Sequence, residues 1–309
     1  MPQLVRAGGG LAGVTIRRGT PDDIRACFDL SIASMGDLFA RQGNEFFSDP
    51  EEFWRHLEPL LRHVATTAAE WWIAVDDADA AMLGYSRSVE RGGLFELTEL
   101  FVRPDRQSAG LGRELIERAF PLGRGAVRAI IATTDVRALA RYYRAGTVVR
   151  FPIASMSGSP ASADAPDLGG LEAATATLED VPELAAIETA VLGYPRDDDY
   201  AWLLEQRSGT IFRRAGRAIG FSFVSAAGSG PIAALDPTDL VPILGHAQAR
   251  ARALGMDELS LDVPMPNEVA MRHLLGRGYK IDPPLTMLMS SEPFGQFDRF
   301  IPFGPSLFL

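Results

Sequence analysis

The clearest pattern of apolar and polar positions lies in residues 96–120. Over residues 96–102 the side chains of Glu96, Thr98, Leu100 and Val102 fall on one face of an extended chain and Glu99 on the other, unless a bulge shifts them. A loop with two glycines follows, and apolar positions at helical spacing continue through residue 120. This order predicts a strand, a tight loop and a helix.

A second strand and helix follow at once. Residues 127–134 form an apolar run typical of a buried strand, and residues 135–146 read as a short helix that ends at Gly146. Three strands are predicted before the glycine loop, and helices are predicted over residues 24–41 and 50–62. The pattern therefore predicts an α/β (α+β) protein.

The glycine loop is suited to a phosphate group. Gly110 and Gly112 have no side chain that would block an anion, and the loop amides and the positive end of the helix dipole favour one. Arg103, Arg106 and Arg113 add positive charge around the loop. We therefore expect a pyrophosphate to bind there.

Two motifs carry a family resemblance. Gln107-x-x-Gly110-x-Gly112 resembles the acyl-CoA signature of the GNAT superfamily of N-acyltransferases, and residues 135–146 are similar to that family's N-x-x-A-x-x-x-Y-x-x-x-G pattern, with Asp135 in place of the usual Asn. The resemblance covers residues of about 14 to 155. A Rossmann turn would instead place three glycines directly after the first strand.

The resemblance implies an N-acetyltransferase that moves an acetyl group from acetyl-CoA, as cosubstrate, to a primary amine of a small molecule or peptide by direct attack in a ternary complex. A longer acyl donor stays open. A different class of function, a non-catalytic acyl-CoA sensor or regulatory module, also stays open. The residues that the resemblance assigns to acetyl-CoA are Leu100, Phe101, Val102, Gln107, Ser108, Ala109, Gly110, Leu111, Gly112, Arg113, Asp135 and Ala138.

Two side chains match the family's catalytic positions. Glu96 resembles the general base, although Glu99 or a water chain stays open in that role. Tyr142 resembles the general acid that protonates the departing thiolate. Its neighbour Tyr143 is expected to pack in the core, and an exchange of the two roles stays open.

The outline of the first half recurs in the second. Three pairs of segments match in order: residues 16–24 with 174–181, residues 83–86 with 219–222, and residues 135–146 with 267–278. We therefore expect two tandem GNAT-like domains, each a mixed, mostly antiparallel central sheet flanked by helices. The predicted boundaries are a catalytic domain at 1–153, a linker at 154–170, and a second domain at 171–309.

The second repeat is predicted to be degenerate. It has no glycine pair after its presumed fourth strand, where Asp236 and Asp239 would repel phosphates. Leu274 stands at the position of Tyr142. The tail, residues 292–309, carries Phe294, Phe297, Phe300, Phe303 and Phe308, and so aromatic a segment must be buried.

Composition limits the partners. The net charge is −10, and residues 161–309 carry 20 acidic against 11 basic side chains while residues 1–160 are near neutral. This argues against nucleic acid and weakly favours a cationic amine as acceptor. Cys27 is the single cysteine, and no metal site is expected. The absence of a leader or a long apolar run predicts a cytoplasmic protein with no membrane association. A monomer and a homodimer both stay open.

Overall fold

A computed structural model describes residues 11–43, 49–107, 110–160, 167–226 and 228–306. The chain divides into two compact units, of which unit 1 comprises Met1–Val89 with Glu99–Pro121, and unit 2 comprises Glu90–Thr98 with Leu122–Leu309. Strand β4 contributes its first half to unit 2 and its second half to unit 1. None of the described helices has the length and apolar character needed to cross a membrane.

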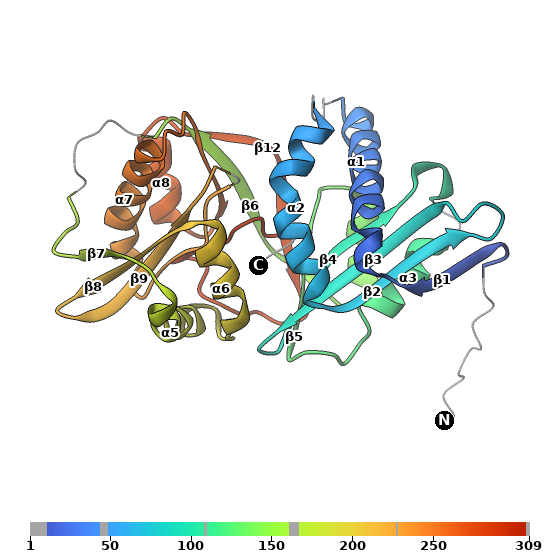
Figure 1. Cartoon of the computed structure of the whole chain (residues 1–309), viewed down its shortest axis with the longest axis horizontal. Coiled ribbons are helices and arrows are strands. Elements are labelled where there is room, and N and C mark those ends of the chain that lie inside the picture. The colour runs from blue at the N-terminus through green and yellow to red at the C-terminus, as the bar shows by residue number, and fades with distance from the viewer. Residues whose placement is uncertain (1–10, 44–48, 108–109, 161–166, 227, 307–309) are drawn as a thin grey trace. The chain divides into compact units, whose positions relative to one another are not determined.

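Unit 1 contains the strands in the order β1-β2-β3-β4, with α1 and α2 in front of them and α3 behind in the view of Figure 1. Its elements are β1 (Val14–Arg18), η1 (Pro21–Asp23), α1 (Ile24–Arg41), α2 (Pro50–Thr66), β2 (Ala68–Asp76), β3 (Met82–Arg91), β4 (Leu94–Val102), η2 (Pro104–Arg106) and α3 (Leu111–Ala119). The inner face of α3 packs Leu111 and Leu115 against Ala74, Leu83 and Val102 of the strands.

The first sheet of unit 2 has the order β4-β5-β12-β6-β11. The pair β4 and β5 is parallel, and the other pairs are antiparallel. Its elements are β5 (Val127–Ala132), α4 (Val136–Arg144), β6 (Val148–Gly158), β11 (Leu259–Pro264), α8 (Glu268–Gly276) and β12 (Lys280–Ser290). The predicted α/β class, with a mixed and mostly antiparallel sheet flanked by helices, is confirmed.

A second sheet of unit 2 has the order β13-β10-β9-β8-β7. Its strands and the remaining helices are β7 (Glu172–Thr175), η3 (Leu178–Asp180), α5 (Val181–Leu192), α6 (Asp197–Gln206), β8 (Ser208–Arg214), β9 (Arg217–Val224), β10 (Ile232–Ala234), η4 (Pro237–Asp239), α7 (Leu240–Ala253) and β13 (Phe300–Ile301). The aromatic tail supplies β13, and its Phe297, Phe300 and Phe303 are buried as predicted. Phe308 lies outside the described residues.

The predicted internal repeat is visible in local structure. Thr20 and Asp23 form a capping box at the start of η1, and Thr177 and Asp180 form the same box at η3. Gly84 and Gly220 also match, because a Cβ on either would lie within 3 Å of a carbonyl oxygen, that of Phe101 or of Ala233. Each glycine therefore permits the same close approach of two neighbouring strands.

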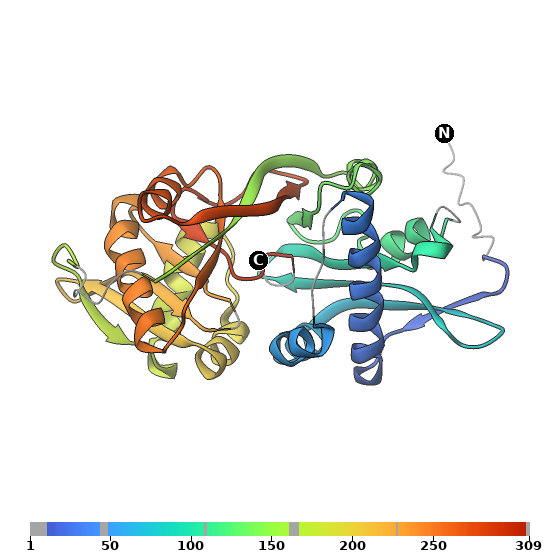
Figure 2. The same cartoon turned by 90° about the horizontal axis from the view of Figure 1, so that it is seen from above.

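The last strands of the two repeats are exchanged within unit 2. Strand β6 of the first repeat pairs with β11 of the second, and β12 of the second repeat pairs with both β5 and β6 of the first. Figures 1 and 2 show β6 and β12 side by side. Strand β6 continues through Gly158 and so includes the first residues of the segment 154–170 that was predicted as a linker. The predicted domain boundaries themselves stay a prediction.

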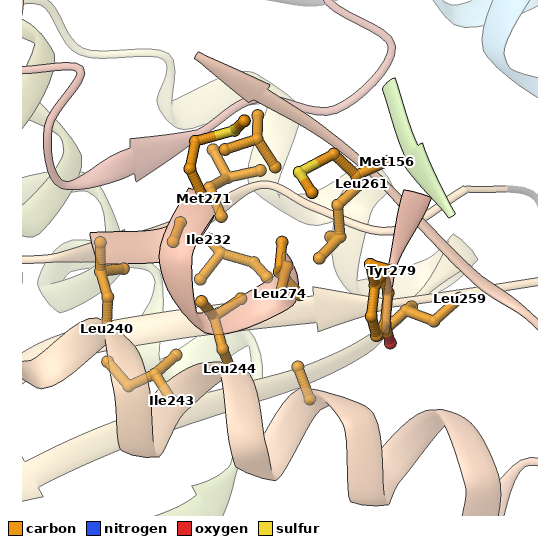
Figure 3. Packing of buried hydrophobic residues seen from close by; sticks show 14 of the residues in the cluster. Met156, Ile232, Leu240, Ile243, Leu244, Leu259, Leu261, Met271, Leu274 and Tyr279 are labelled. Carbon is orange, nitrogen blue, oxygen red and sulfur yellow. The ribbon is translucent and has the colours of Figure 1, made fainter. Parts of the chain in front are cut away.

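The exchange also places first-repeat side chains in the core of the second repeat. Ala154 and Met156 of β6 belong to a buried cluster with Leu261, Leu274 and Tyr279, and Figure 3 shows Met156 beside Leu261. The helix α7 closes this cluster with Leu240, Ile243 and Leu244. The exchanged strand thus contributes to the hydrophobic stabilisation of the repeat it enters.

Candidate active site

The predicted phosphate loop leads from β4 into α3. Gly110 caps α3 in the left-handed region (φ 88°), which a glycine adopts without strain, and its carbonyl accepts from the Arg113 amide at 3.0 Å. Leu111 and Gly112 form the buried start of the helix. Gln107 Nε2 donates to the Val102 carbonyl at 3.3 Å, which ties the loop to the strand. Ser108 and Ala109 lie outside the described residues.

The loop has less uncompensated positive charge around it than predicted. Arg103 is paired with Asp105 at 2.7 Å, and Arg106 is paired with Asp76 at 2.9 Å. These exposed pairs already compensate two of the three expected cations. The Arg113 guanidinium remains near the loop, 4.0 Å from where a Cβ on Gly110 would stand.

The end of β4 carries Leu100, Phe101 and Val102, three of the residues that the resemblance assigns to acetyl-CoA. Leu100 and Phe101 are half-buried, and Val102 is buried in the core of unit 1. The ring of Phe101 packs 5.6 Å from that of Tyr85. These contacts fix the strand as far as the point where the loop begins.

Glu99 lies in a buried ion-pair network of unit 1. Its carboxylate accepts from the Tyr85 hydroxyl at 2.7 Å and pairs with the Arg87 guanidinium at 3.0 Å. Arg87 also stacks over the Trp71 ring, 4.3 Å from its centroid. Sequence reasoning missed this network, for which the signal was Tyr85 and Arg87 two positions apart, and so on one face of β3.

Glu96 lies in a different environment, in unit 2. It pairs in register with Ala129 of β5 and is only 1% exposed. Tyr194, from the connection between α5 and α6, is buried, and burial is the main cause that raises the pKa of its hydroxyl, with Glu188 and Glu96 acting in the same direction. Burial therefore keeps the Glu96 carboxylate out of direct contact with a group at the protein surface.

Tyr142 projects from α4, the helix that follows β5. Asp135 caps this helix by accepting from the Arg137 amide at 2.9 Å, so an aspartate serves where the family pattern has Asn. Tyr142 is 8% exposed, and burial raises the pKa of its hydroxyl to about 12. Ala138, one turn earlier, is half-buried.

The predicted core role of Tyr143 is wrong, because its side chain is 51% exposed. Successive residues of a helix point about 100° apart, and α4 buries only one face, so Tyr142 and Tyr143 cannot both face inward. The exposed Tyr143 hydroxyl accepts from the Val149 amide at 3.4 Å.

The corresponding positions of the second repeat carry different groups. Asp239 stands at the N-cap position of α7 and pairs with Arg214 at 2.7 Å, so this helix start already holds a carboxylate. Asn267 caps α8 by accepting from the Ala270 amide at 3.0 Å. Leu274 of α8 is fully buried in the cluster of Figure 3.

The chain has the mixed α/β fold of solved GNAT acetyltransferases. Residues 34–147 match the family model described as Acetyltransferase (GNAT) family. A search of curated proteins gives no match.

Solved structures share the fold over most of the chain. A proposed acetyltransferase from Pyrococcus horikoshii superposes with a TM-score of 0.71 at 16% identity, over 96% of each chain. A GCN5-related N-acetyltransferase from Sphaerobacter thermophilus gives a TM-score of 0.61 at 16% identity, over 90% of this chain and 95% of that one. A tandem GNAT protein from the clavulanic acid biosynthesis pathway gives 0.57 at 12% identity, over 91% and 99%.

Proposed function

We propose that the protein is an acetyl-CoA-dependent N-acetyltransferase whose single reaction centre belongs to the first repeat. The observation that carries this proposal is the start of α3 at Gly110, in the left-handed conformation, within the stretch that matches the acetyltransferase family. Acetyl-CoA supplies the thioester, and the amides from Gly110 to Gly112 bind its pyrophosphate. The equivalent helix start in the second repeat has Asp239 at its N-cap position, which disfavours a second anion site.

Glu96 is the better of the two candidate bases. The Glu99 carboxylate is engaged by Arg87 and Tyr85, and a base that holds a salt bridge must break it to take a proton. Because Glu96 is buried, it receives the proton of the attacking ammonium through a water molecule. This combines two of the alternatives that the sequence left open, a carboxylate and a water chain.

Tyr142 is the proton donor on the leaving-group side. With a pKa raised to about 12 its phenol stays protonated at neutral pH, as a donor must. A thiol has a pKa near ~8.5, so the phenol stabilises the departing thiolate by a hydrogen bond more readily than by full proton transfer. The neutral amine nitrogen forms the new bond to the acetyl carbon while the carbon–sulfur bond breaks. Glu96 already holds the proton of the former ammonium, so the second proton of the nitrogen passes through solvent to the departing thiolate, which is released as a thiol.

The acceptor class is a primary amine of a small molecule or peptide. Thiol release from acetyl-CoA, measured with polyamines, aminoglycosides, amino acids and short peptides, tests this proposal. We expect turnover with at least one amine and its loss in Glu96→Gln, most strongly at low pH, with acetyl-CoA affinity retained. Tight acetyl-CoA binding without turnover on any amine would instead support the acyl-CoA sensor.

A further inference from the structure

Strand β10 of the second repeat corresponds to the last part of β4. Gly84 and Gly220 permit the close strand approach in the two repeats. A Cβ on the first would lie 2.9 Å from the Phe101 carbonyl oxygen, and one on the second would lie 2.8 Å from that of Ala233. The three residues of β10 therefore stand at the positions of residues 100–102, which the resemblance assigns to acetyl-CoA.

In the first repeat this part of β4 extends beyond the pairing with β5. The parallel pairing of the two strands covers Leu94–Leu97, and within the described residues it goes no further. The backbone amides past that point, on the edge that faces away from β3, can bind the amide groups and the thioester oxygen of acetyl-CoA. We call this edge the donor slot, residues 100–102 in the first repeat and Ile232–Ala234 in the second.

The donor slot of the second repeat is filled by the aromatic tail. Strands β10 and β13 form an antiparallel pair, in which Ile232 lies opposite Ile301. The Ala234 amide donates to the Arg299 carbonyl at 3.1 Å, at the position that Val102 has in the first repeat. The backbone of the tail thus takes an amide that a bound donor would use.

The tail also fills the space beside this edge. Ile301 is fully buried, in a cluster that contains Val263 of β11 and Leu274 of α8, the residue at the position of Tyr142. Strand β13 therefore contacts both β10 and β11, which correspond to β4 and β5 of the first repeat. All of these second-repeat residues lie in unit 2.

Arg207 holds the tail in place just after β13. Its guanidinium lies over the Phe303 ring, 3.2 Å from the centroid, and its Nη1 donates to the carbonyls of Gly228 and Gly230. Both side chains are buried. A guanidinium stacked on an aromatic face and removed from water is a favourable contact, so Phe303 anchors the strand that precedes it.

We propose that the aromatic tail is a built-in occupant of the second repeat's donor slot, a strand that takes the place of the pantetheine arm of an acyl-CoA. This inference rests on the proposed function, in which the slot of the first repeat receives acetyl-CoA. An extended peptide and a pantetheine arm both present amide groups along a chain, so each can pair with an exposed strand edge. The second repeat is thus closed by its own chain, and release of the tail opens a slot for an acyl-pantetheine.

Amide hydrogen exchange of β10 in the full-length chain tests this inference. Phe303→Ala removes the ring under Arg207 and should speed the exchange of Ile232–Ala234 by ~10-fold or more, because the tail strand leaves its edge more often. S-acetylpantetheine is the probe, since it lacks the nucleotide phosphates that Asp239 would repel. It should slow the exchange again in Phe303→Ala and have no effect on β10 of the native chain. Exchange that is not faster in this variant, or that the probe does not slow, overturns the inference.

Two further variants keep the test specific. Phe294→Ala is the matched control, because it removes a tail ring that packs on Tyr194, with ring centroids 6.1 Å apart, outside the donor slot. It should leave the exchange of β10 at the native rate, and an equal rise there would contradict a role of the tail specific to the slot. Arg207→Lys keeps the charge and loses the flat face over Phe303. It should show the same response to the probe at smaller size, so the test does not depend on the folding of Phe303→Ala.

Titration with acetyl-CoA separates this inference from the proposed function. If the native chain binds no acetyl-CoA, the proposed function fails. If the native chain binds acetyl-CoA while S-acetylpantetheine leaves β10 of Phe303→Ala unprotected, only the present inference fails, and the tail is a structural strand.

Discussion

Met289 of β12 lies directly opposite Ile130 of β5, although the two residues are separated by more than half of the chain. Next to them, Ser290 lies opposite Ala129. The strand that carries Glu96 is paired to β5, and β5 in turn depends on a strand from the end of the second repeat. Only β5 therefore separates β4, which carries the candidate base, from β12 of the second repeat.

This pairing predicts that the first repeat does not fold alone. Truncation after Ser155 removes β12 and leaves β5 and β6 with unpaired edges and exposed apolar side chains. We expect aggregation, or a monomer without a cooperative thermal transition, in gel filtration and circular dichroism.

The matched control restores the missing strand in trans. Coexpression of residues 1–160 with residues 167–309 should give a soluble complex, because both exchanged strands are then present. A monodisperse, cooperatively folded 1–155 fragment would contradict the prediction.

One acetyl-CoA should bind per chain, in the first repeat. Isothermal titration is expected to give a stoichiometry near one. Gly110→Asp should abolish binding, because the left-handed conformation strains a side chain and the carboxylate repels phosphate. Gly36→Asp, in an open position of α1, adds the same charge and should bind normally. A stoichiometry of two would show that the second repeat also binds the donor.

Removal of the phenol of Tyr142 should slow the chemical step. We expect Tyr142→Phe to lower the single-turnover rate by ~10²–10⁴-fold, with little change in acetyl-CoA affinity. Tyr143→Phe is the control, because it alters the adjacent, exposed phenol. If the Tyr143 variant were the slower one, the roles of the two tyrosines would be exchanged.

The ion pair of Arg91 and Asp199 should matter most when only one partner is removed. Both side chains are buried, so Arg91→Met leaves a carboxylate without its arginine and should lower the free energy of unfolding by ~3–5 kcal/mol. The double variant Arg91→Met/Asp199→Leu should recover most of this loss. Urea denaturation measures the free energy of unfolding of each variant. Equal losses in the single and the double variant would show that Arg91 and Asp199 do not stabilise each other.

The carboxyl group of Asp262 should make the free energy of unfolding depend on pH. Burial raises its pKa to about 6, against the effect of a hydrogen bond with Ser155. The unfolded chain ionises this carboxyl near pH ~3.9, so its contribution to stability is present below that pH and is lost as the pH rises through about 6.

Asp262→Asn keeps a neutral side chain at every pH. It should therefore raise the free energy of unfolding above pH ~6.5 by at most ~3 kcal/mol, and change it little at pH ~4. Thermal unfolding at the two pH values measures the difference. Equal effects at both would show that Asp262 does not ionise with a raised pKa.

Local signals in the sequence predicted local structure well. The helix that starts at the glycine loop, the short helix over residues 135–146 and the matching segments 16–24 and 174–181 all depend on residues a few positions apart, and each is present. The strand exchange was not predictable in this way, because the apolar pattern of β12 is the same whichever sheet receives it. The ion pairs of Arg103 and Arg106 were likewise hidden, since a charge count does not show which acid each arginine meets.

The exchanged strands also order events during synthesis. Domains generally fold from the N-terminus as the chain leaves the ribosome. Here β5 obtains its second neighbour only when β12, Lys280–Ser290, has been translated and has emerged. The sheet that carries the candidate base is thus completed only after β12 has emerged, and until then its open edge is exposed to chaperones, proteases and neighbouring nascent chains.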